Sequence, residues 1–103
     1  MIVYVDIDDT ICRRPSNSDL DYSQAFPINE RIHKINQLYD DGNMIIYWTA
    51  RGTQTGKCWF QITLSQLHTW GCKFNELRMG KPVYDLFIDD KNINADTFFS
   101  NTN

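Results

Sequence analysis

The sequence predicts an α/β domain with a small parallel sheet in a three-layer arrangement. Two observations support this prediction. Continuous apolar runs at residues 2–5 and 44–48 are typical of strands that are buried on both faces, as at the centre of a parallel sheet. After each run, apolar residues recur at helical spacing, and strands that alternate with helices form parallel βαβ units with right-handed crossovers.

The segment between the first strand and the first helix, residues 11–27, is polar and lacks a regular period. Its many turn-forming residues predict a loop or small flap over the end of the first strand. A helix is expected next, because Ile28, Ile32 and Ile35 begin an apolar stripe that continues to Tyr39. Gly42 then ends this helix.

The remaining elements follow the second strand. We expect a helix from a cap at Thr55 to Gly71, an edge strand within 74–79, a strand over 83–88 and a helical turn at Phe98–Phe99. Residues 100–103 are expected to fray. No repeat or linker interrupts the chain, so residues 1–103 are predicted to form one Rossmann-like domain.

Composition excludes several classes of function. The net charge is −3 and the basic residues are scattered, which argues against binding nucleic acid mainly through its phosphates. No apolar run is long enough to cross a bilayer, and the N-terminus is a core strand rather than a signal peptide. The three cysteines form no C-x-x-C and leave one unpaired, which favours a reduced, cytoplasmic setting.

Acidic residues gather in two short clusters, each directly after an expected strand. These acids are Asp6, Asp8, Asp9, Asp89 and Asp90. The carboxyl ends of parallel strands meet at one edge of an open sheet, which is where such sheets bind ligands. Carboxylates crowded there repel one another unless a cation or a shared proton compensates. The sequence therefore predicts a metal-assisted site at this edge.

The residue types at this edge suit phosphate chemistry. Mg²⁺ takes oxygen ligands and relies on one or two carboxylates plus substrate phosphate, a need that Asp6 with Asp89 or Asp90 meets. Thr49, after the second strand, can donate to a phosphate oxygen. Lys81, beside the rigid Pro82, adds positive charge where an anionic transition state needs it.

Two carboxylates can divide the covalent chemistry between them. A metal-neutralised aspartate such as Asp6 is a competent nucleophile towards phosphorus and forms an aspartyl-phosphate. Asp8 can act first as acid and then as base. Arg51 either grips the substrate or pairs with an acid of the site. Arg13 and Arg14 either meet an anionic substrate or form a solvated charge pair, and the second interpretation is favoured.

Four segments resemble the ordered motifs of the haloacid dehalogenase-like (HAD) phosphatases. Residues 6–10 resemble their DxDxT signature, and Thr49, Lys81 and residues 87–90 resemble the second, third and fourth motifs. The resemblance covers residues 2 to about 92. Asp8 favours phosphatase over dehalogenase chemistry, because dehalogenases lack this acid.

The resemblance also implies a role for each matched residue. Asp6 would be the nucleophile and Asp8 the general acid/base, while Asp6, the Asp8 carbonyl and Asp89 would bind Mg²⁺. Thr49 and Lys81 would hold the transferring phosphoryl group. The role of Asp90 stays open between a metal contact through water and a purely structural one.

The chain is too short for a cap domain. It resembles short, capless members found in capsule and surface-polysaccharide gene clusters and in phages, which makes a sugar phosphate the leading substrate by analogy. A nucleotide or nucleic acid 3′-phosphatase remains an alternative, although the net acidity argues against nucleic acid. The small sheet favours a homo-oligomer.

Two alternatives belong to other classes of function. A phospho-accepting receiver module also combines aspartates, a hydroxyl and a lysine beside proline, but here the lysine precedes the strand that carries the second acidic pair. A catalytically idle metal-binding or assembly module is disfavoured by the intact Asp8. Without the other motifs, Asp8 and Asp9 would be interpreted as turn caps, and Thr49 and Lys81 as ordinary loop residues.

Overall fold

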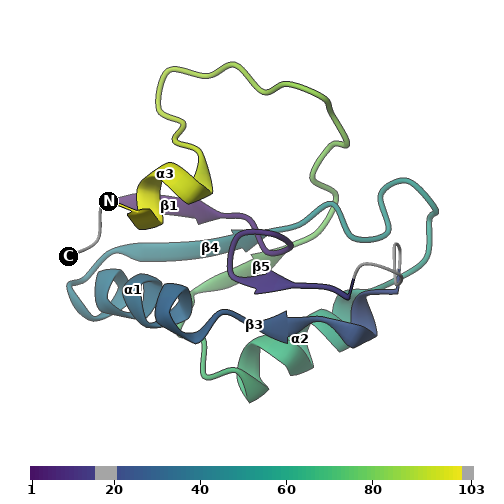
Figure 1. The fold of residues 1–103 in the computed structure, drawn as a ribbon, viewed down its shortest axis with the longest axis horizontal. Helices are drawn as coiled ribbons and strands as arrows, with labels where there is room; N and C mark the ends of the chain where they lie inside the picture. Colours follow the sequence, from purple (N-terminus) through teal and green to yellow (C-terminus); the bar gives the residue numbers. More distant parts are fainter. Residues whose placement is uncertain (16–20, 101–103) are drawn as a thin grey trace.

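The computed structural model describes residues 1–15 and 21–100. At its centre is a parallel sheet of β1 (Ile2–Val5), β4 (Met44–Trp48) and β5 (Glu76–Arg78), in the order β1-β4-β5 (Figure 1). The continuous apolar runs of β1 and β4 pair in parallel along their whole length, from Ile2 beside Met44 to Val5 beside Tyr47. This is the Rossmann-like α/β arrangement that the sequence predicts.

The two long helices cover the same face of this sheet, so among the described residues two of the three expected layers are present. They are α1 (Asn29–Asp40) and α2 (Phe60–Thr69), each connecting two parallel strands. Ile32 and Ile35 of α1 and Leu67 of α2 are buried in one core cluster with Val5 and Tyr47 of the strands. On the opposite face, alternate strand residues such as Ile2, Tyr4 and Met44 are exposed.

The remaining elements are short. The flap segment forms a two-stranded antiparallel ribbon of β2 (Cys12–Arg13) and β3 (Phe26–Pro27), with a 3-10 helix η1 (Tyr22–Gln24) between them. The expected loop at 11–27 therefore contains some regular structure, and its residues 16–20 lie outside the described part. At the other end, α3 (Ala95–Ser100) packs Phe98 and Phe99 against the core. Ser100 belongs to this helix, and the rest of the tail expected to fray, 101–103, lies outside the described residues.

The second helix begins later than predicted, at Phe60 instead of after Thr55. Thr55 accepts a hydrogen bond from the backbone N–H of Lys57, so it caps a turn and not the helix. The chain folds back tightly here, since a Cβ on Gly52 would lie 2.1 Å from the carbonyl oxygen of Lys57. This turn delays the helix until the chain reaches the buried Trp59. No helix among the described residues has the length and apolarity needed to span a membrane.

The predicted strand over 83–88 is wrong. The whole 79–94 segment, which connects β5 to α3, contains neither helix nor strand, and every residue from Pro82 to Asn94 is exposed. Figure 1 shows it as a long bow above β1. As a result β1 lies at the edge of the sheet, and the expectation that it is a central strand buried on both faces is also wrong.

The cause lies in the connection before residue 83. β5 ends at the carboxyl end of the sheet, whereas a strand parallel to β1 would have to begin at the amino end. A crossover connection between the two ends needs about a dozen residues or more. Only Met79–Pro82 separate β5 from Val83. Residues 83–88 have the composition of a strand, but the connection is too short for them to reach the amino end of the sheet in their own chain.

Candidate active site

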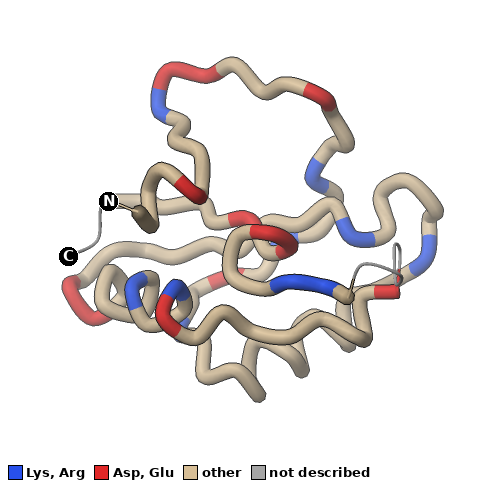
Figure 2. The backbone as a smooth tube through the Cα atoms, in the orientation of Figure 1, with Lys and Arg blue, Asp and Glu red and all other residues tan. Residues whose placement is uncertain are grey.

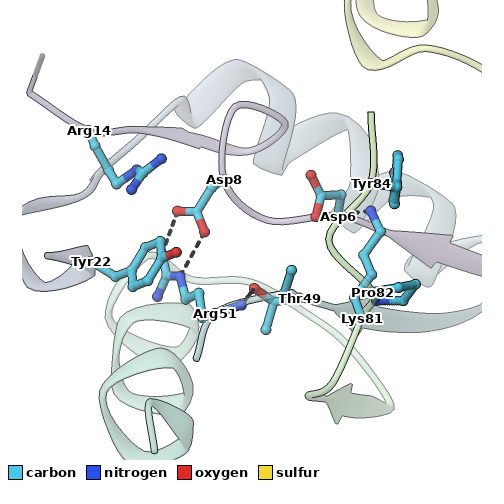
Figure 3. Close-up of a pocket in the computed structure, with 10 residues that line it drawn as sticks. Asp6, Asp8, Arg14, Tyr22, Thr49, Arg51, Lys81, Pro82 and Tyr84 are labelled. Atoms are coloured by element: carbon cyan, nitrogen blue, oxygen red, sulfur yellow. Dashed lines mark hydrogen bonds and ion pairs between the residues drawn. The ribbon is translucent and has the colours of Figure 1, made fainter. Parts of the chain in front are cut away.

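A cavity of about 220 Å³ opens at the carboxyl end of the sheet (Figure 3). Its lining comes from four parts of the chain: the loop after β1, the flap, the loop after β4 and the start of the 79–94 segment. The lining residues are Asp6, Asp8, Arg14, Tyr22, Thr49, Ala50, Arg51, Lys81, Pro82 and Tyr84. The structure therefore brings together five of the predicted site residues, namely Asp6, Asp8, Thr49, Arg51 and Lys81.

Asp6 follows β1 directly and is the more open of the two carboxylates. Its side chain is 36% exposed and accepts a hydrogen bond from the Thr10 hydroxyl at 3.2 Å. The ammonium group of Lys81 lies 3.3 Å from its other oxygen. Thr10 is in position because the chain turns sharply after Asp8, where Asp9 adopts a left-handed backbone with φ 62°. One carboxylate oxygen of Asp6 thus faces a cation across the cavity floor.

Thr49 is buried at the end of β4, between Asp6 and Arg51 in Figure 3. Its hydroxyl oxygen accepts a hydrogen bond from the backbone N–H of Arg51 at 3.1 Å. Its hydroxyl hydrogen can therefore be donated into the cavity. The backbone of Thr49 also holds the next segment, because its carbonyl accepts from the N–H of Lys81 at 3.0 Å.

Asp8 is paired with Arg51. The Nε and one Nη atom of Arg51 donate to the two carboxylate oxygens of Asp8, each at 2.9 Å. The other Nη atom donates to Thr63 and Gln66 of α2, and the Arg51 side chain is fully buried. All three nitrogens of the guanidinium group are therefore occupied. Arg51 holds Asp8 in place and has no nitrogen left to bind a substrate. Of the two roles left open by the sequence, the structure shows the pairing.

The flap supplies two cavity residues: Tyr22, which the sequence argument did not consider, and Arg14, for which it favoured a solvated charge pair. Tyr22 places its ring under the guanidinium groups of both Arg14 and Arg51, at 4.8 and 4.9 Å from the ring centroid. Gln66 of α2 fixes Tyr22 by donating to its carbonyl at 2.8 Å. The Nη1 atom of Arg14 is buried and bonds to none of the described residues, and Figure 3 shows this guanidinium directed towards Asp8. Arg13, in contrast, lies outside near Asp9 and Asp96.

Asp89 and Asp90 do not join the site within this chain. Both are exposed in the 79–94 segment, where Asp89 accepts from the N–H of Asp90 and Lys91 lies 3.9 Å from Asp90. Figure 2 shows the acidic residues of the bow well apart from those of the loop after β1. Among residues 1–15 and 21–100 no three metal-ligating side chains of the His, Cys, Asp and Glu types come together. The predicted ligand set of Asp6, Asp8, Asp89 and Asp90 is therefore only half assembled.

Cys12 lies behind Asp8 and does not compete as a nucleophile. Burial, reinforced by the neighbouring negative charge of Asp8, raises the pKa of its thiol to about 12. The thiol donates weakly to the carbonyl of Ile7 and to Asp8. It is a protonated, space-filling group at neutral pH.

Comparisons with known proteins bear on the fold. No family model matches the chain, and no curated protein matches it. A crystal structure of a target protein from Vibrio cholerae is similar over 99% of this chain and 89% of its own, with a TM-score of 0.83 and 23% sequence identity. This similarity supports the α/β fold and says nothing about function.

Proposed function

We propose that this protein is a Mg²⁺-dependent phosphomonoester hydrolase that acts through an aspartyl-phosphate on Asp6. The observation that supports this most is the position of Asp6. Its partly open carboxylate lines the cavity, with the ammonium group of Lys81 beside one oxygen and the Thr10 hydroxyl beside the other. The order of Asp6, Asp8, Thr49 and Lys81 along the chain, which resembles that of HAD phosphatases, agrees with this arrangement.

In the first step an Asp6 oxygen bonds to phosphorus while the bond from phosphorus to the leaving oxygen breaks. The leaving oxygen takes a proton that Asp8 supplies, which requires Asp8 to carry that proton when the substrate is bound. In the second step water attacks phosphorus and gives its proton to Asp8, and the bond between phosphorus and Asp6 breaks. Arg51 positions Asp8 at the cavity through its bonds to the two carboxylate oxygens.

Thr49 and Lys81 would bind the phosphoryl oxygens. The Thr49 hydroxyl has its acceptor side taken by Arg51, so it is oriented as a donor. Lys81 contributes a fixed positive charge, because its backbone is bonded to Thr49. The hard oxygen atoms of Asp6 fit Mg²⁺, and a bound ion would offset the repulsion between this carboxylate and an anionic substrate. Asp89 would be the further carboxylate ligand.

The open cavity supports a proposal about the class of substrate. No cap domain covers it in the described residues, and Arg14 and Tyr22 of the flap form its outer wall. A ring with a polar, charged neighbour suits a phosphorylated sugar, which we propose as the substrate. The three free cysteines agree with a cytoplasmic location, which we propose as well.

The test is phosphate release from a panel of an aryl phosphate, sugar phosphates and nucleotides, with Mg²⁺ and with EDTA. We expect turnover with Mg²⁺, loss of turnover with EDTA, and the highest kcat/KM for a sugar phosphate. Tight metal binding without release from any ester would contradict the proposal and support a binding module. A stable phosphoryl adduct without turnover would support a signalling module.

Arg14 provides a prediction about substrate binding. Arg14→Ala is expected to raise KM for the best ester about 10- to 100-fold with little change in stability, because Arg14 lines the cavity and its Nη1 has no hydrogen-bond partner among the described residues. Steady-state kinetics measure this effect. Arg13→Ala is the matched control, since Arg13 is exposed and lies outside the cavity, and its KM should stay within about twofold. An unchanged KM in Arg14→Ala would rule out this contact.

A further inference from the structure

The sheet has an unsatisfied edge. β1 pairs with β4 on one side, and no described residue pairs with its other side. Its residues Ile2 and Tyr4 are 67% and 49% exposed, although the sequence of β1 is that of a central strand. An apolar strand with a free edge is a template for pairing with another strand.

The chain also contains a strand-forming segment that has no sheet. In Val83–Ile88 every residue except Asp85 is apolar, and all six are exposed. Leu86 and Ile88 are 76% and 87% exposed, which is unusual for large aliphatic side chains that lie close together. The segment ends in Asp89 and Asp90, the acids that are missing from the candidate active site.

The segment cannot pair in parallel with β1 of its own chain. Lys81 is held at the carboxyl edge of the sheet, through its backbone bond to Thr49 and its contact with Asp6. A parallel strand would have to begin at the amino edge, roughly 13 Å away along β1 at about 3.3 Å per residue. Pro82 alone lies between Lys81 and Val83, so two residue steps separate them, and these span at most about 7 Å. Antiparallel pairing would leave Asp89 at the wrong edge.

A second copy of the chain removes this conflict. When two copies face each other across a two-fold axis, their β1 edges run in opposite directions. A segment that leaves the carboxyl edge of one sheet then meets the amino end of β1 in the other copy and can run parallel to it. Its last residues, Asp89 and Asp90, arrive at the carboxyl end of that strand, beside Asp6 of the partner subunit.

We propose that this protein is a dimer in which two copies exchange residues 83–90. Each Val83–Ile88 adds a parallel strand to β1 of the other copy, and each Asp89 completes the active site of the other copy. We assign the partner as a second copy because each chain carries one unpaired edge, on β1, and one unpaired strand-forming segment, Val83–Ile88. The role given to Asp89 as a metal ligand rests on the proposed phosphatase function, whereas the exchange itself does not.

The first test is the mass of the protein in solution, measured by light scattering with size-exclusion chromatography. The wild-type chain is expected at twice the 12.1 kDa of one copy.

The double variant Leu86→Asp, Ile88→Asp is expected to raise the dissociation constant at least about 100-fold, because it places two charges in the new strand. Both residues are exposed in the single chain, so the variant should keep its fold. Ile93→Asp, also at an exposed isoleucine but beyond the strand, is the control and should remain dimeric. A monomeric wild type, or a dimer that the double variant leaves intact, would overturn the proposal.

The second test identifies which copy supplies Asp89. Asp6→Asn and Asp89→Asn should each be inactive alone, but coexpressed chains should recover about a quarter of wild-type activity, because half of the dimers are mixed and each has one intact site. A dimer without this recovery would overturn the exchange. An active monomer would do so as well and would leave the phosphatase proposal standing. A dimer that dissociates in the double variant but hydrolyses no ester would support the exchange and reject the phosphatase.

Discussion

Asp6→Asn is expected to lower kcat for the best phosphomonoester at least about 10⁴-fold, because the amide cannot form the covalent bond to phosphorus. The fold should survive. The side chain is 36% exposed, and an amide oxygen can still accept the hydrogen bond from Thr10. The measurement is the rate of phosphate release at saturating substrate and Mg²⁺, with circular dichroism to check the fold.

The chain offers a matched control three residues away. Asp9→Asn makes the same chemical change in the same loop, on an exposed side chain outside the cavity, and asparagine tolerates the left-handed backbone at this position. Its kcat should stay within about threefold of the wild type. If kcat fell equally in both variants, the loss would come from the reduced negative charge of the loop and not from the loss of a nucleophile at Asp6.

Arg51→Met is expected to lower the free energy of unfolding by about 3 kcal/mol, the lower end of the cost of breaking a buried ion pair. The Arg51 side chain is fully buried and that of Asp8 is 17% exposed, so removal of the guanidinium leaves a carboxylate with little water to replace it. Thr63 and Gln66 of α2 lose a donor at the same time. Urea unfolding at neutral pH measures the change.

Two further variants separate this effect from a general loss of surface charge. Arg13→Ala removes an arginine whose side chain is 42% exposed, and should change the free energy of unfolding by less than about 1 kcal/mol. Arg51→Lys keeps the charge but not the two parallel bonds to Asp8, and should lie between wild type and Arg51→Met. If Arg51→Met cost no more than Arg13→Ala, the pair with Asp8 would not stabilise the fold.

The sequence predicted the elements whose hydrophobic pattern and neighbours agree. β4 and α1 formed where the apolar run and the helical stripe placed them. Ile45 of β4 and Ile35 of α1 are buried in the same core cluster, and this packing does not depend on an unusual turn. The start of α2 was wrong because the turn around Gly52 depends on a close backbone approach to Lys57 that periodicity does not encode. Local pattern determines element type better than element boundary.

The strand over 83–88 shows a different limit. Its composition is that of a strand, but whether a strand forms within one chain depends on the length of the connection before it. The short distance between β5 and Val83 was visible in the sequence, and counting it would have excluded a parallel crossover. The same count leads to the exchange proposed between two copies.

The candidate site was predictable where it depends on strand ends. Asp6 and Thr49 follow β1 and β4 directly, and the parallel register of these strands brings them together. Tyr22 was not predicted as a cavity residue, and for Arg14 the solvated interpretation was favoured, because the positions of both depend on how the flap folds against α2 through Gln66. The one available signal was the arginine pair that closely follows the acidic cluster, and it was interpreted as solvated.

The central claim is that Asp6 becomes phosphorylated during turnover. The most direct measurement uses Asp8→Asn with an aryl phosphate, whose leaving oxygen departs without a proton from Asp8, so that the first step can still occur. The amide cannot accept the proton of the attacking water, so the phosphorylated enzyme accumulates. The variant is mixed with the ³²P-labelled aryl phosphate and Mg²⁺, quenched in acid and digested. We predict label on the peptide that contains Asp6, released by hydroxylamine as expected for an acyl phosphate. Turnover by the wild type together with an unlabelled variant, or label on any other residue, would contradict the account.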